Sequence, residues 1–389
     1  MSDNTPKSSR NKRPLRILFV NFSYVIDVYQ RKLEVAARTG DVEIGVLAPR
    51  KWYMREWNKT LTLEAHYPGI RLFPANVWFL NGVQGGHLYP LLTVLKTLIA
   101  FKPDVLQVEQ EVFSLVAFEM AIFARIFKIP LVIFCWENMD KEFSFIRKFT
   151  RKFVFDTARV INPGNEDAAK LMRKWGYKGA IEIMPQLGVD LEMFQPSREP
   201  NNDRTFSVGY LGRLVPEKGI DLILNAAKQL IDVGVDFQLI ICGSGPEGAA
   251  LKELAIQLQI TKKISWNGSY PYKDVPQAIS LMDVLVLPSR TLPGIWKEQF
   301  GHVLVEAMAM GVPVIGSSSG AIPEVIGKED QIFCENDPRG LAAILHKMIT
   351  DKPWREQARQ NGLDKVAEEF SHEVVANKMI AVWERICRK

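Results

Sequence analysis

The sequence predicts an α/β protein built from two domains of similar size. Short apolar runs alternate with amphipathic stretches at helical spacing along most of the chain, a pattern typical of parallel strands joined by helices. The chain has 389 residues, of which 47% are hydrophobic and 24% charged, enough for two domains with their own cores. A polar segment with prolines at 194–204 interrupts the periodicity and indicates an interdomain linker. Two such domains facing each other would form a cleft.

The first domain is expected at 15–195, after a disordered tail at 1–14. Apolar runs predict its buried parallel strands at 15–21, 42–48, 104–109 and 129–136. The tail is polar and basic, and the apolar run that follows it is too short for a signal peptide or a membrane span. We therefore expect a cytoplasmic protein.

After the linker at 196–204, the second domain is expected at 205–371. Its strands are predicted at 206–212, 236–243, 262–268, 283–289 and 312–318, with amphipathic helices such as 221–234 between them. The last segment, 372–389, follows a serine and has apolar residues at helical spacing, so it predicts a terminal helix.

Charge and cysteine content exclude several classes of function. The formal net charge of +5 and the pI near 8.8 suit phosphorylated substrates or an anionic membrane surface, but the charge is too diffuse to indicate nucleic-acid binding. The four cysteines form no CxxC pair, so the sequence indicates neither a zinc site nor a disulfide framework.

The stretch EQFGHVLVE, from Glu298 to Glu306, carries the most chemical information. It places one carboxylate on a loop and the other inside an apolar helix that is expected to begin near Gly301. The first N–H groups and the positive dipole end of that helix would form an anion site. Glu306 has apolar neighbours, so it needs polar partners if it is buried rather than a surface acid. A phosphate would fit between two acids that bind hydroxyl groups.

Two cations follow a predicted strand in GYLGRLVPEKGID. Arg213 and Lys218 come after Gly212, at the carboxyl end of a strand, where α/β folds bind ligands. Further along, Gly243 and Gly245 in CGSGPE follow another strand. They indicate either a wall of the same ligand pocket or a tight turn into a helix.

Together these motifs resemble the retaining GT-B glycosyltransferases of family GT4. The resemblance is carried by GRLVPEKGID (212–221), IICGSGPE (240–247), DVLVLPS (283–289), the long run 298–326 and PQLGVDLEMFQP (185–196). It implies a GT-B fold of two Rossmann-like domains, in which the C-terminal domain binds a nucleotide-sugar and the N-terminal domain binds the acceptor. It also implies that the final helix crosses back to the first domain.

The resemblance assigns roles to individual residues. Arg213 and Lys218 would neutralise the departing nucleoside diphosphate, Glu298 would face the donor sugar, and Glu306 would bind the ribose. The backbone around Phe300, Gly301, His302 and Val303 would lie close to sugar or phosphate, whereas the His302 side chain is expected to be structural. Gly212, Gly243 and Tyr270 would complete the donor site.

Metal independence is expected because no D-x-D triplet occurs in the sequence. Without that carboxylate pair, the two cations would take the place of a metal ion at the diphosphate. No cofactor is expected.

The predicted acceptor side departs from the family pattern. The segment after the first strand, NFSYVIDVYQRK, contains no glycine, which puts close backbone approach to the donor phosphates in doubt. Where a histidine often ends a strand, this chain has Trp136, followed by Glu137 and Asn138. These three residues and Glu109 are the candidates for acceptor binding, with His87 as an alternative.

The segment 141–155 interleaves lysine and arginine with phenylalanine at near-helical spacing. Such a segment either lies on an anionic membrane surface or packs on its own domain. Membrane contact would suit a lipid-linked acceptor.

The sequence thus predicts transfer of a sugar from a nucleoside-diphosphate sugar to a hydroxyl acceptor, which could be a glycan, a lipid-linked molecule or a small molecule. Retention of configuration is implied by the resemblance alone. Two other functions remain open: a nucleotide-sugar-binding subunit without turnover, and a GT-B sugar-nucleotide epimerase.

Overall fold

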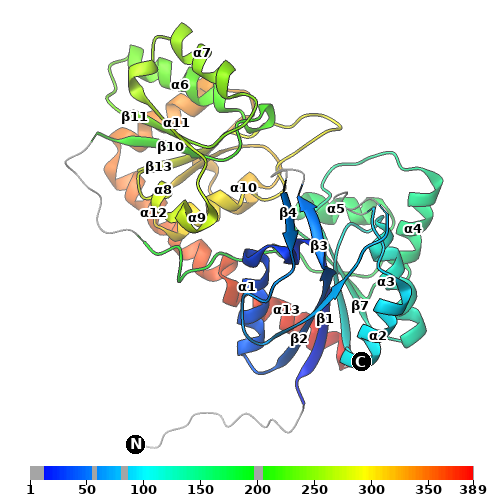
Figure 1. Ribbon diagram of the computed structural model, residues 1–389. Coiled ribbons are helices and arrows are strands. Elements are labelled where there is room, and N and C mark those ends of the chain that lie inside the picture. Colours follow the sequence, from blue (N-terminus) through cyan, green and yellow to red (C-terminus); the bar gives the residue numbers. More distant parts are fainter. Residues whose placement is uncertain (1–12, 55–58, 80–85, 197–204, 389) are drawn as a thin grey trace, which may run out of the picture. The chain divides into compact units, whose positions relative to one another are not determined.

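The computed structural model describes residues 13–54, 59–79, 86–196 and 205–388 (Figure 1). They form two compact units. The first unit comprises the chain up to Ile133, the segment Phe149–Arg159 and the chain from Ala376 onward, and the second comprises Phe134–Lys148 and Val160–Val375. The predicted tail at 1–14 and linker at 196–204 lie almost wholly outside the described residues.

The first sheet has seven strands in the order β5-β2-β1-β6-β7-β8-β9. They are β1 (Leu15–Val20), β2 (Val42–Pro49), β5 (Ile70–Ala75), β6 (Val105–Glu109), β7 (Leu131–Cys135), β8 (Val160–Pro163) and β9 (Ala180–Ile181). In the parallel register of β1, Ile17 lies opposite Ile44 of β2 and Val105 of β6. β6 and β7 are buried throughout, which explains their continuous apolar sequences.

Helices and a short hairpin complete the first half of the chain. The helices are α1 (Asp27–Arg38), α2 (Leu91–Phe101), α3 (Leu115–Phe127), α4 (Phe145–Phe155) and α5 (Glu166–Lys174). Side-chain caps fix two of their starts: Ser114 accepts from the Ala117 N–H, and Asn165 accepts from the Ala168 N–H. The hairpin pairs β3 (Lys51–Met54) with β4 (Lys59–Thr62). The sequence did not predict it.

The second sheet has six parallel strands in the order β12-β11-β10-β13-β14-β15. They are β10 (Ser207–Leu211), β11 (Gln238–Cys242), β12 (Ile264–Gly268), β13 (Val284–Leu287), β14 (Val314–Ser317) and β15 (Ile332–Phe333). The chain moves outward on one side of β10 and then returns to its other side. This reversal of strand order lies beside the carboxyl end of β10, the position where open α/β sheets bind ligands.

Most helices of the second half of the chain pack on this sheet, whereas the last one lies mainly in the first unit. They are α6 (Ile220–Asp232), α7 (Gly248–Gln257), α8 (Val275–Ile279), α9 (His302–Ala309), α10 (Ile322–Ile326), α11 (Pro338–Thr350), α12 (Lys352–Lys365) and α13 (His372–Cys387). A 3-10 turn at Pro216–Lys218 follows β10, and a π-helical turn at Val366–Phe370 precedes α13. The strands and the terminal helix predicted from the sequence are all present. Six short strands, β3, β4, β5, β8, β9 and β15, were not predicted.

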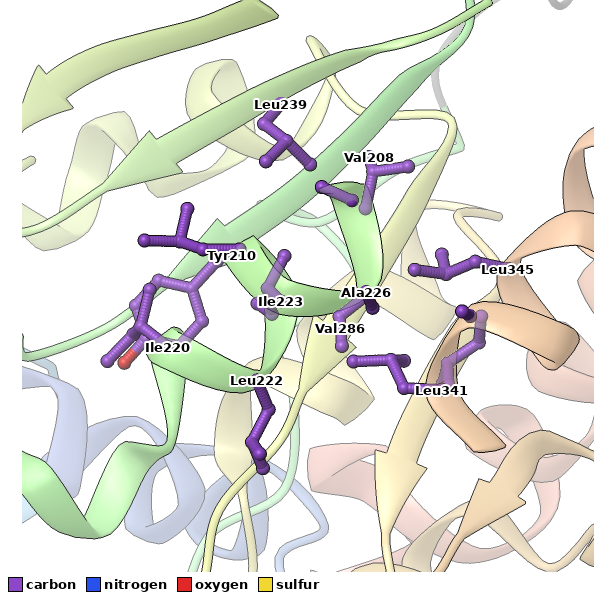
Figure 2. Close-up of a cluster of buried hydrophobic side chains, with 14 of the residues drawn as sticks. Val208, Tyr210, Ile220, Leu222, Ile223, Ala226, Leu239, Val286, Leu341 and Leu345 are labelled. Carbon is purple, nitrogen blue, oxygen red and sulfur yellow. The ribbon is translucent and has the colours of Figure 1, made fainter. Parts of the chain in front are cut away.

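Alternate side chains of the strands in the second sheet point to opposite faces. Both faces are buried, because helices pack on each of them. Figure 2 shows one face, where Val208 and Leu239 from the strands lie near Ile223 of α6 and Leu341 of α11. On the other face, residues such as Leu285 pack with α9 in a separate buried cluster. Each fully buried Leu or Ile contributes about 1.5–3 kcal/mol. This packing fixes the position of α9, which carries Glu306.

The end of α13 packs within the first unit through Trp383. Its ring is buried against Phe19 of β1 at a centroid distance of 5.6 Å, and its Nε1–H donates to Gln107 Oε1 of β6 at 2.9 Å. The terminal helix therefore contributes a core side chain to the first sheet.

Among the described residues, no helix is both long and apolar enough to cross a bilayer.

Candidate functional site

Lys218 is positioned by a tight turn after β10. It ends the 3-10 turn, and Gly219 follows it with φ of +63°, a left-handed conformation that favours glycine. A Cβ at Gly219 would lie 2.2 Å from the carbonyl oxygen of Pro288. The glycine therefore lets this turn lie directly against the loop that follows β13.

Lys218, Ser289 and Glu298 meet at one carboxylate oxygen. Lys218 Nζ lies 2.5 Å from Glu298 Oε2, and Ser289 Oγ donates to the same oxygen at 2.8 Å. Only 15% of the Lys218 side chain and 8% of the Glu298 side chain are exposed. Lys218 Nζ also lies 4.9 Å from the ring centroid of Trp296, a cation–π contact. We call Lys218, Ser289 and Glu298 the Lys218–Glu298 cluster.

The backbone of Glu298 is held as firmly as its side chain. Its carbonyl oxygen accepts from Asn138 Nδ2 at 3.0 Å and from the Ala321 N–H at 3.1 Å. Gly320, with φ of +53°, passes so close that a Cβ there would lie 1.9 Å from the same oxygen. Asn138, a predicted acceptor residue, thus contacts the loop that carries Glu298.

Trp136 lies beside the start of α9. Its ring centroid is 6.0 Å from that of Phe300 and 6.5 Å from that of His302. The indole Nε1–H donates to Gln186 Oε1 at 2.8 Å. The ring covers Gly164, where a Cβ would come within 2.0 Å of it. The residue that replaces the usual histidine is therefore fixed next to the predicted donor segment.

Glu137, the neighbour of Trp136, is buried and has local partners. Its carboxylate accepts from the Met139 N–H at 3.2 Å and pairs with Lys141 Nζ at 2.6 Å. These contacts stabilise the loop after β7. Its proposed role toward an acceptor stays a prediction.

The helix α9 begins at His302, where the sequence predicted it. Gly301 precedes the helix with φ of +86°, and a Cβ there would lie 2.8 Å from Leu287 Cδ2. The first N–H groups of α9 have no acceptor within the helix, because no helical turn precedes them. Val303 and Tyr270 pack partly buried against the apolar cluster around α9. Phe300 is buried in the same cluster.

Glu306 is buried on α9, as its apolar neighbours suggested. Burial raises the pKa of the Glu306 carboxyl to about 7, and a hydrogen bond from Tyr272 lowers it in part. The Tyr272 ring in turn contacts Phe194 at a centroid distance of 5.9 Å. Glu306 therefore has one polar partner in the described residues, and its protonation changes near neutral pH.

His302 contributes little positive charge at neutral pH. Burial lowers the pKa of its imidazole to about 4, although the charge of Glu298 acts in the opposite direction. Its ring lies 4.8 Å from that of Phe300. A neutral, packed imidazole agrees with the structural role expected for this side chain.

The loops after β10 and β11 interlock through glycines. A Cβ at Gly243 would lie 1.8 Å from the Gly212 carbonyl oxygen, and one at Gly245 would lie 2.3 Å from the Leu214 carbonyl oxygen. Gly212 N–H donates to the Cys242 carbonyl at 3.0 Å. The two predicted glycine-bearing segments therefore form one surface at the carboxyl edge of the sheet.

Arg213 lies on that surface but is less constrained than Lys218. Its side chain is 58% exposed, and its guanidinium lies 3.6 Å from Glu217. Its carbonyl accepts from the buried Tyr210 hydroxyl at 2.7 Å. Burial, followed by the nearby charge of Glu298, raises the pKa of the Tyr210 phenol. The backbone at Arg213 is fixed, whereas its side chain can reorient.

Glu109 lies in the first unit, at the end of β6. It forms an ion pair with the buried Lys32 and accepts from the Tyr24 hydroxyl at 2.9 Å. Burial lowers the pKa of the Lys32 ammonium, and the charge of Glu109 partly restores it. The carboxylate thus links β6 to α1 within the first unit. Acceptor binding by Glu109 stays a prediction.

His87, the alternative acceptor candidate, is fully buried in the first unit. Its ring is surrounded by Phe22, Trp52 and Tyr89 at centroid distances of 4.8–6.2 Å. Burial lowers the pKa of its imidazole to about 4. The structure therefore places it in an aromatic core.

Three polar contacts of the site were missed by sequence reasoning. Ser289 ends a strand that was predicted, and a small hydroxyl residue at a strand's carboxyl end could have marked it. Gln186 and Tyr272 carry no local signal, because their partners Trp136 and Glu306 are distant in sequence. Among the described residues, no group of three or more His, Cys, Asp or Glu side chains is placed to hold a metal ion.

Comparison with solved structures assigns the fold. HepE from Anabaena, whose structure contains UDP, superposes with a TM-score of 0.73 at 18% identity, covering 95% of this chain and all of that one. A glycosyltransferase from Rickettsia africae superposes with the same TM-score at 14% identity, covering 97% and 100% of the two chains. At these identities the likeness concerns the fold, which is GT-B.

Sequence relatives are glycosyltransferases by name. A GDP-mannose-dependent monoacylated alpha-(1-6)-phosphatidylinositol monomannoside mannosyltransferase from Corynebacterium glutamicum is 30% identical over 53% of this chain and 56% of its own length. The putative colanic acid biosynthesis glycosyltransferase WcaL from Escherichia coli is 29% identical over 60% of this chain and 58% of its own. The chain thus spans a little over half the length of these relatives.

The model of the family described as glycosyl transferases group 1 matches residues 192–365. This segment contains Arg213, Lys218, Ser289, Glu298 and Glu306. This part of the chain is therefore similar to the glycosyl transferases of group 1.

Proposed function

We propose that this chain is a glycosyltransferase that moves a sugar from a nucleoside-diphosphate sugar to a hydroxyl acceptor. The Lys218–Glu298 cluster is the observation that carries the proposal, because a little-exposed cation and an acid meet at the carboxyl edge of the second sheet. The names of the relatives support the reaction class, and the UDP in the HepE structure supports a nucleotide ligand for this fold.

Different residues of the proposed donor site bind the diphosphate, the sugar and the ribose. Lys218 and Arg213 bind the diphosphate, and the N–H groups at the start of α9 add a helix N-terminus to the same anion site. Glu298 accepts hydrogen bonds from sugar hydroxyls through the carboxylate that Ser289 orients. Glu306 accepts hydrogen bonds from the ribose hydroxyls in its ionised form.

The transfer breaks the bond between the anomeric carbon and the diphosphate oxygen and forms a bond from the acceptor oxygen to that carbon. The acceptor proton passes to the leaving diphosphate on the same face of the sugar, which gives retention. Lys218 stabilises the charge that grows on the diphosphate as the bond breaks. The reaction needs no metal ion in this proposal, since the cations neutralise the leaving group.

The acceptor is a hydroxyl compound of the glycan, lipid-linked or small-molecule class. Trp136, Glu137 and Asn138 are proposed to shape its binding, and Trp136 carries most of this role because its ring stands beside Phe300 and His302. An aromatic ring at this position offers an apolar platform for a sugar face.

The experiment is to measure nucleoside diphosphate release by the purified chain across a panel of UDP-, GDP- and ADP-sugars. The expected result is release of the diphosphate from at least one donor, with a rate about two orders of magnitude lower in Lys218→Ala. Binding without release would favour a nucleotide-binding subunit. Conversion of the donor to its sugar epimer without acceptor transfer would favour an epimerase.

A further inference from the structure

One side of the helix α4 packs on α3. Phe153 packs against Phe118 at a centroid distance of 5.1 Å, and the Arg125 guanidinium lies over the Phe153 ring at 4.1 Å. Thr150 and Val154 are buried on this side of the helix. The inner side of α4 is therefore filled by packing within the protein.

The opposite side of α4 presents aromatic rings and cations together. Phe145, Lys148, Phe149 and Lys152 follow the i, i+3, i+4, i+7 spacing that places side chains on one helix face. We call these four residues the α4 outer face. Phe145 is 85% exposed and its neighbour Ile146 is 69% exposed. Phe149 lies at the border with the packed side: it is 53% exposed, and its ring also contacts Phe118 at a centroid distance of 6.0 Å. The packing of α4 on α3 does not fully cover these large aromatic rings. Their exposure therefore indicates that this face binds a partner outside the chain.

The charge of α4 selects the chemistry of that partner. The sequence of the helix, FIRKFTRKFVF, contains four cations and no acid. The ion pair between Lys152 and Asp156, at 2.6 Å, is highly exposed and contributes little to stability. A second copy of this chain would bring the same cations face to face, which is repulsive. The face suits an anionic surface.

The helices α2 and α3 of the first unit also carry exposed apolar side chains. Leu91 and Leu92 at the start of α2 and Ile126 near the end of α3 are 60–65% exposed. The segment before α2 is tied to α3, because the Tyr89 N–H donates to the Glu119 carboxylate at 3.0 Å. Exposed apolar side chains thus extend beyond α4.

We propose that the α4 outer face docks the protein on a membrane that contains anionic phospholipids. Lys148 and Lys152 meet the lipid phosphates, and Phe145 and Phe149 enter the boundary between headgroups and acyl chains. Neither contribution alone gives stable binding, so the two act together. This inference does not depend on the transfer chemistry, because it concerns a surface outside the Lys218–Glu298 cluster.

The test is co-sedimentation of the full chain with vesicles of phosphatidylcholine and with vesicles of equal parts phosphatidylcholine and phosphatidylglycerol. We expect binding to the second kind only, and a loss of binding as salt rises. The double variant Phe145→Ser with Ile146→Ser should bind about tenfold more weakly. Lys148→Glu with Lys152→Glu should weaken binding by a similar factor or more.

Matched controls carry the same substitutions away from α4. Val233→Ser with Ile256→Ser removes exposed apolar side chains of 70% and 57% exposure, and Lys262→Glu reverses an exposed charge. These controls should bind anionic vesicles like the wild type. Nucleoside diphosphate release without vesicles should be unchanged in all α4 variants, which separates this inference from the proposed function.

Three results would overturn the inference. They are absence of wild-type binding to anionic vesicles, equal loss of binding in the control variants, and a change of oligomeric state in the α4 variants with vesicle binding intact. The last result would assign the face to a second copy of the chain.

Discussion

The ion pair between Lys218 and Glu298 joins a cation suited to phosphate with an acid suited to sugar hydroxyls. Because Ser289 donates to the same carboxylate oxygen, Glu298 keeps one hydrogen-bond donor when Lys218 turns toward a diphosphate. In the proposed donor site, the pair would couple the diphosphate half of the donor to its sugar half. Removing either member changes the environment of the other.

Loss of Lys218 should damage the chemical step. Lys218→Ala is expected to lower kcat by about two orders of magnitude, since the contact strengthens as charge grows on the leaving group.

Glu306→Gln should mainly raise the donor KM, because the proposed ribose contacts are equal in ground and transition states. Steady-state kinetics measure kcat and the donor KM for this variant and for Lys218→Ala. Lys228→Ala, an exposed lysine paired with Asp232 on α6, serves as the control and should behave as wild type.

The contact between Lys218 and Glu298 also predicts non-additivity. The double variant Lys218→Ala with Glu298→Gln should lose less kcat/KM than the product of the two single losses, by about tenfold, because each single change leaves the other group without its partner. A double-mutant cycle on kcat/KM measures this factor. Strictly multiplicative losses would mean that the two side chains act independently in turnover.

Glu306 should make stability depend on pH. Burial raises its folded-state pKa to about 7 from an ordinary value of 4.5, so the folded protein binds the proton more tightly than the unfolded chain does. The free energy of unfolding should therefore fall as pH rises from about 4.5 through 7 and then level off. Glu306→Gln should remove about 3 kcal/mol of this change.

The measurement is Tm at pH 5 and pH 8 for the wild type and Glu306→Gln. Burial likewise raises the pKa of Glu119 to about 7, in the first unit, so Glu119→Gln is the matched comparison. Equal slopes in wild type and Glu306→Gln would show that Glu306 has no raised pKa in the fold.

At the scale of elements, the start of α9 depends on a single left-handed residue. Gly301→Ala adds backbone strain at φ of +86° and a contact of 2.8 Å with the buried Leu287 side chain. Gly234→Ala adds similar strain at φ of +80° with nothing within 4 Å, which makes it the control. We expect a loss of about 1 kcal/mol for Gly234→Ala and more for Gly301→Ala.

The donor KM shows whether Gly301→Ala changes donor binding as well as stability. Gly301→Ala should raise the donor KM because it shifts the first N–H groups of α9, whereas Gly234→Ala at the end of α6 should leave KM unchanged. Urea denaturation gives the stability of both variants. An unchanged donor KM in a folded Gly301→Ala protein would remove the helix start from the anion site.

Strands could be predicted from the sequence where they are long and buried on both faces. Strands such as β11 and β13 are covered on both faces, so they appear as unbroken apolar runs in the sequence. The strands β9 and β15 have two residues each, and β3 and β4 have four, which is too short for a periodic signal. Their formation depends on a neighbouring strand.

The site was predictable where local sequence defines it. Lys218, Gly219 and Gly301 occupy turns whose backbone requirements can be read from adjacent residues. Contacts between distant residues could not be read in this way: Lys218 and Glu298 are 80 positions apart, and Asn138 and Glu298 are 160 apart. The fold alone brings these groups together, so their hydrogen bonds had no signature in the sequence.

At the scale of the whole molecule, the reaction should need no added metal. The sequence has no D-x-D triplet, and Lys218 already lies at the carboxyl edge where a diphosphate would bind. Turnover of the preferred donor should therefore survive excess EDTA. A strict requirement for Mg²⁺ or Mn²⁺, lost with EDTA and restored by adding the ion, would contradict this.

The packing of Trp383 against Phe19 has a consequence for synthesis. The first unit needs both the earliest described strand and the last helix, whereas most of the second unit is the continuous segment Val160–Val375. As the chain leaves the ribosome, the second unit can close before Trp383 has emerged. We therefore expect the usual order, in which the N-terminal part folds first, to be reversed here, with the core of the first sheet completed last.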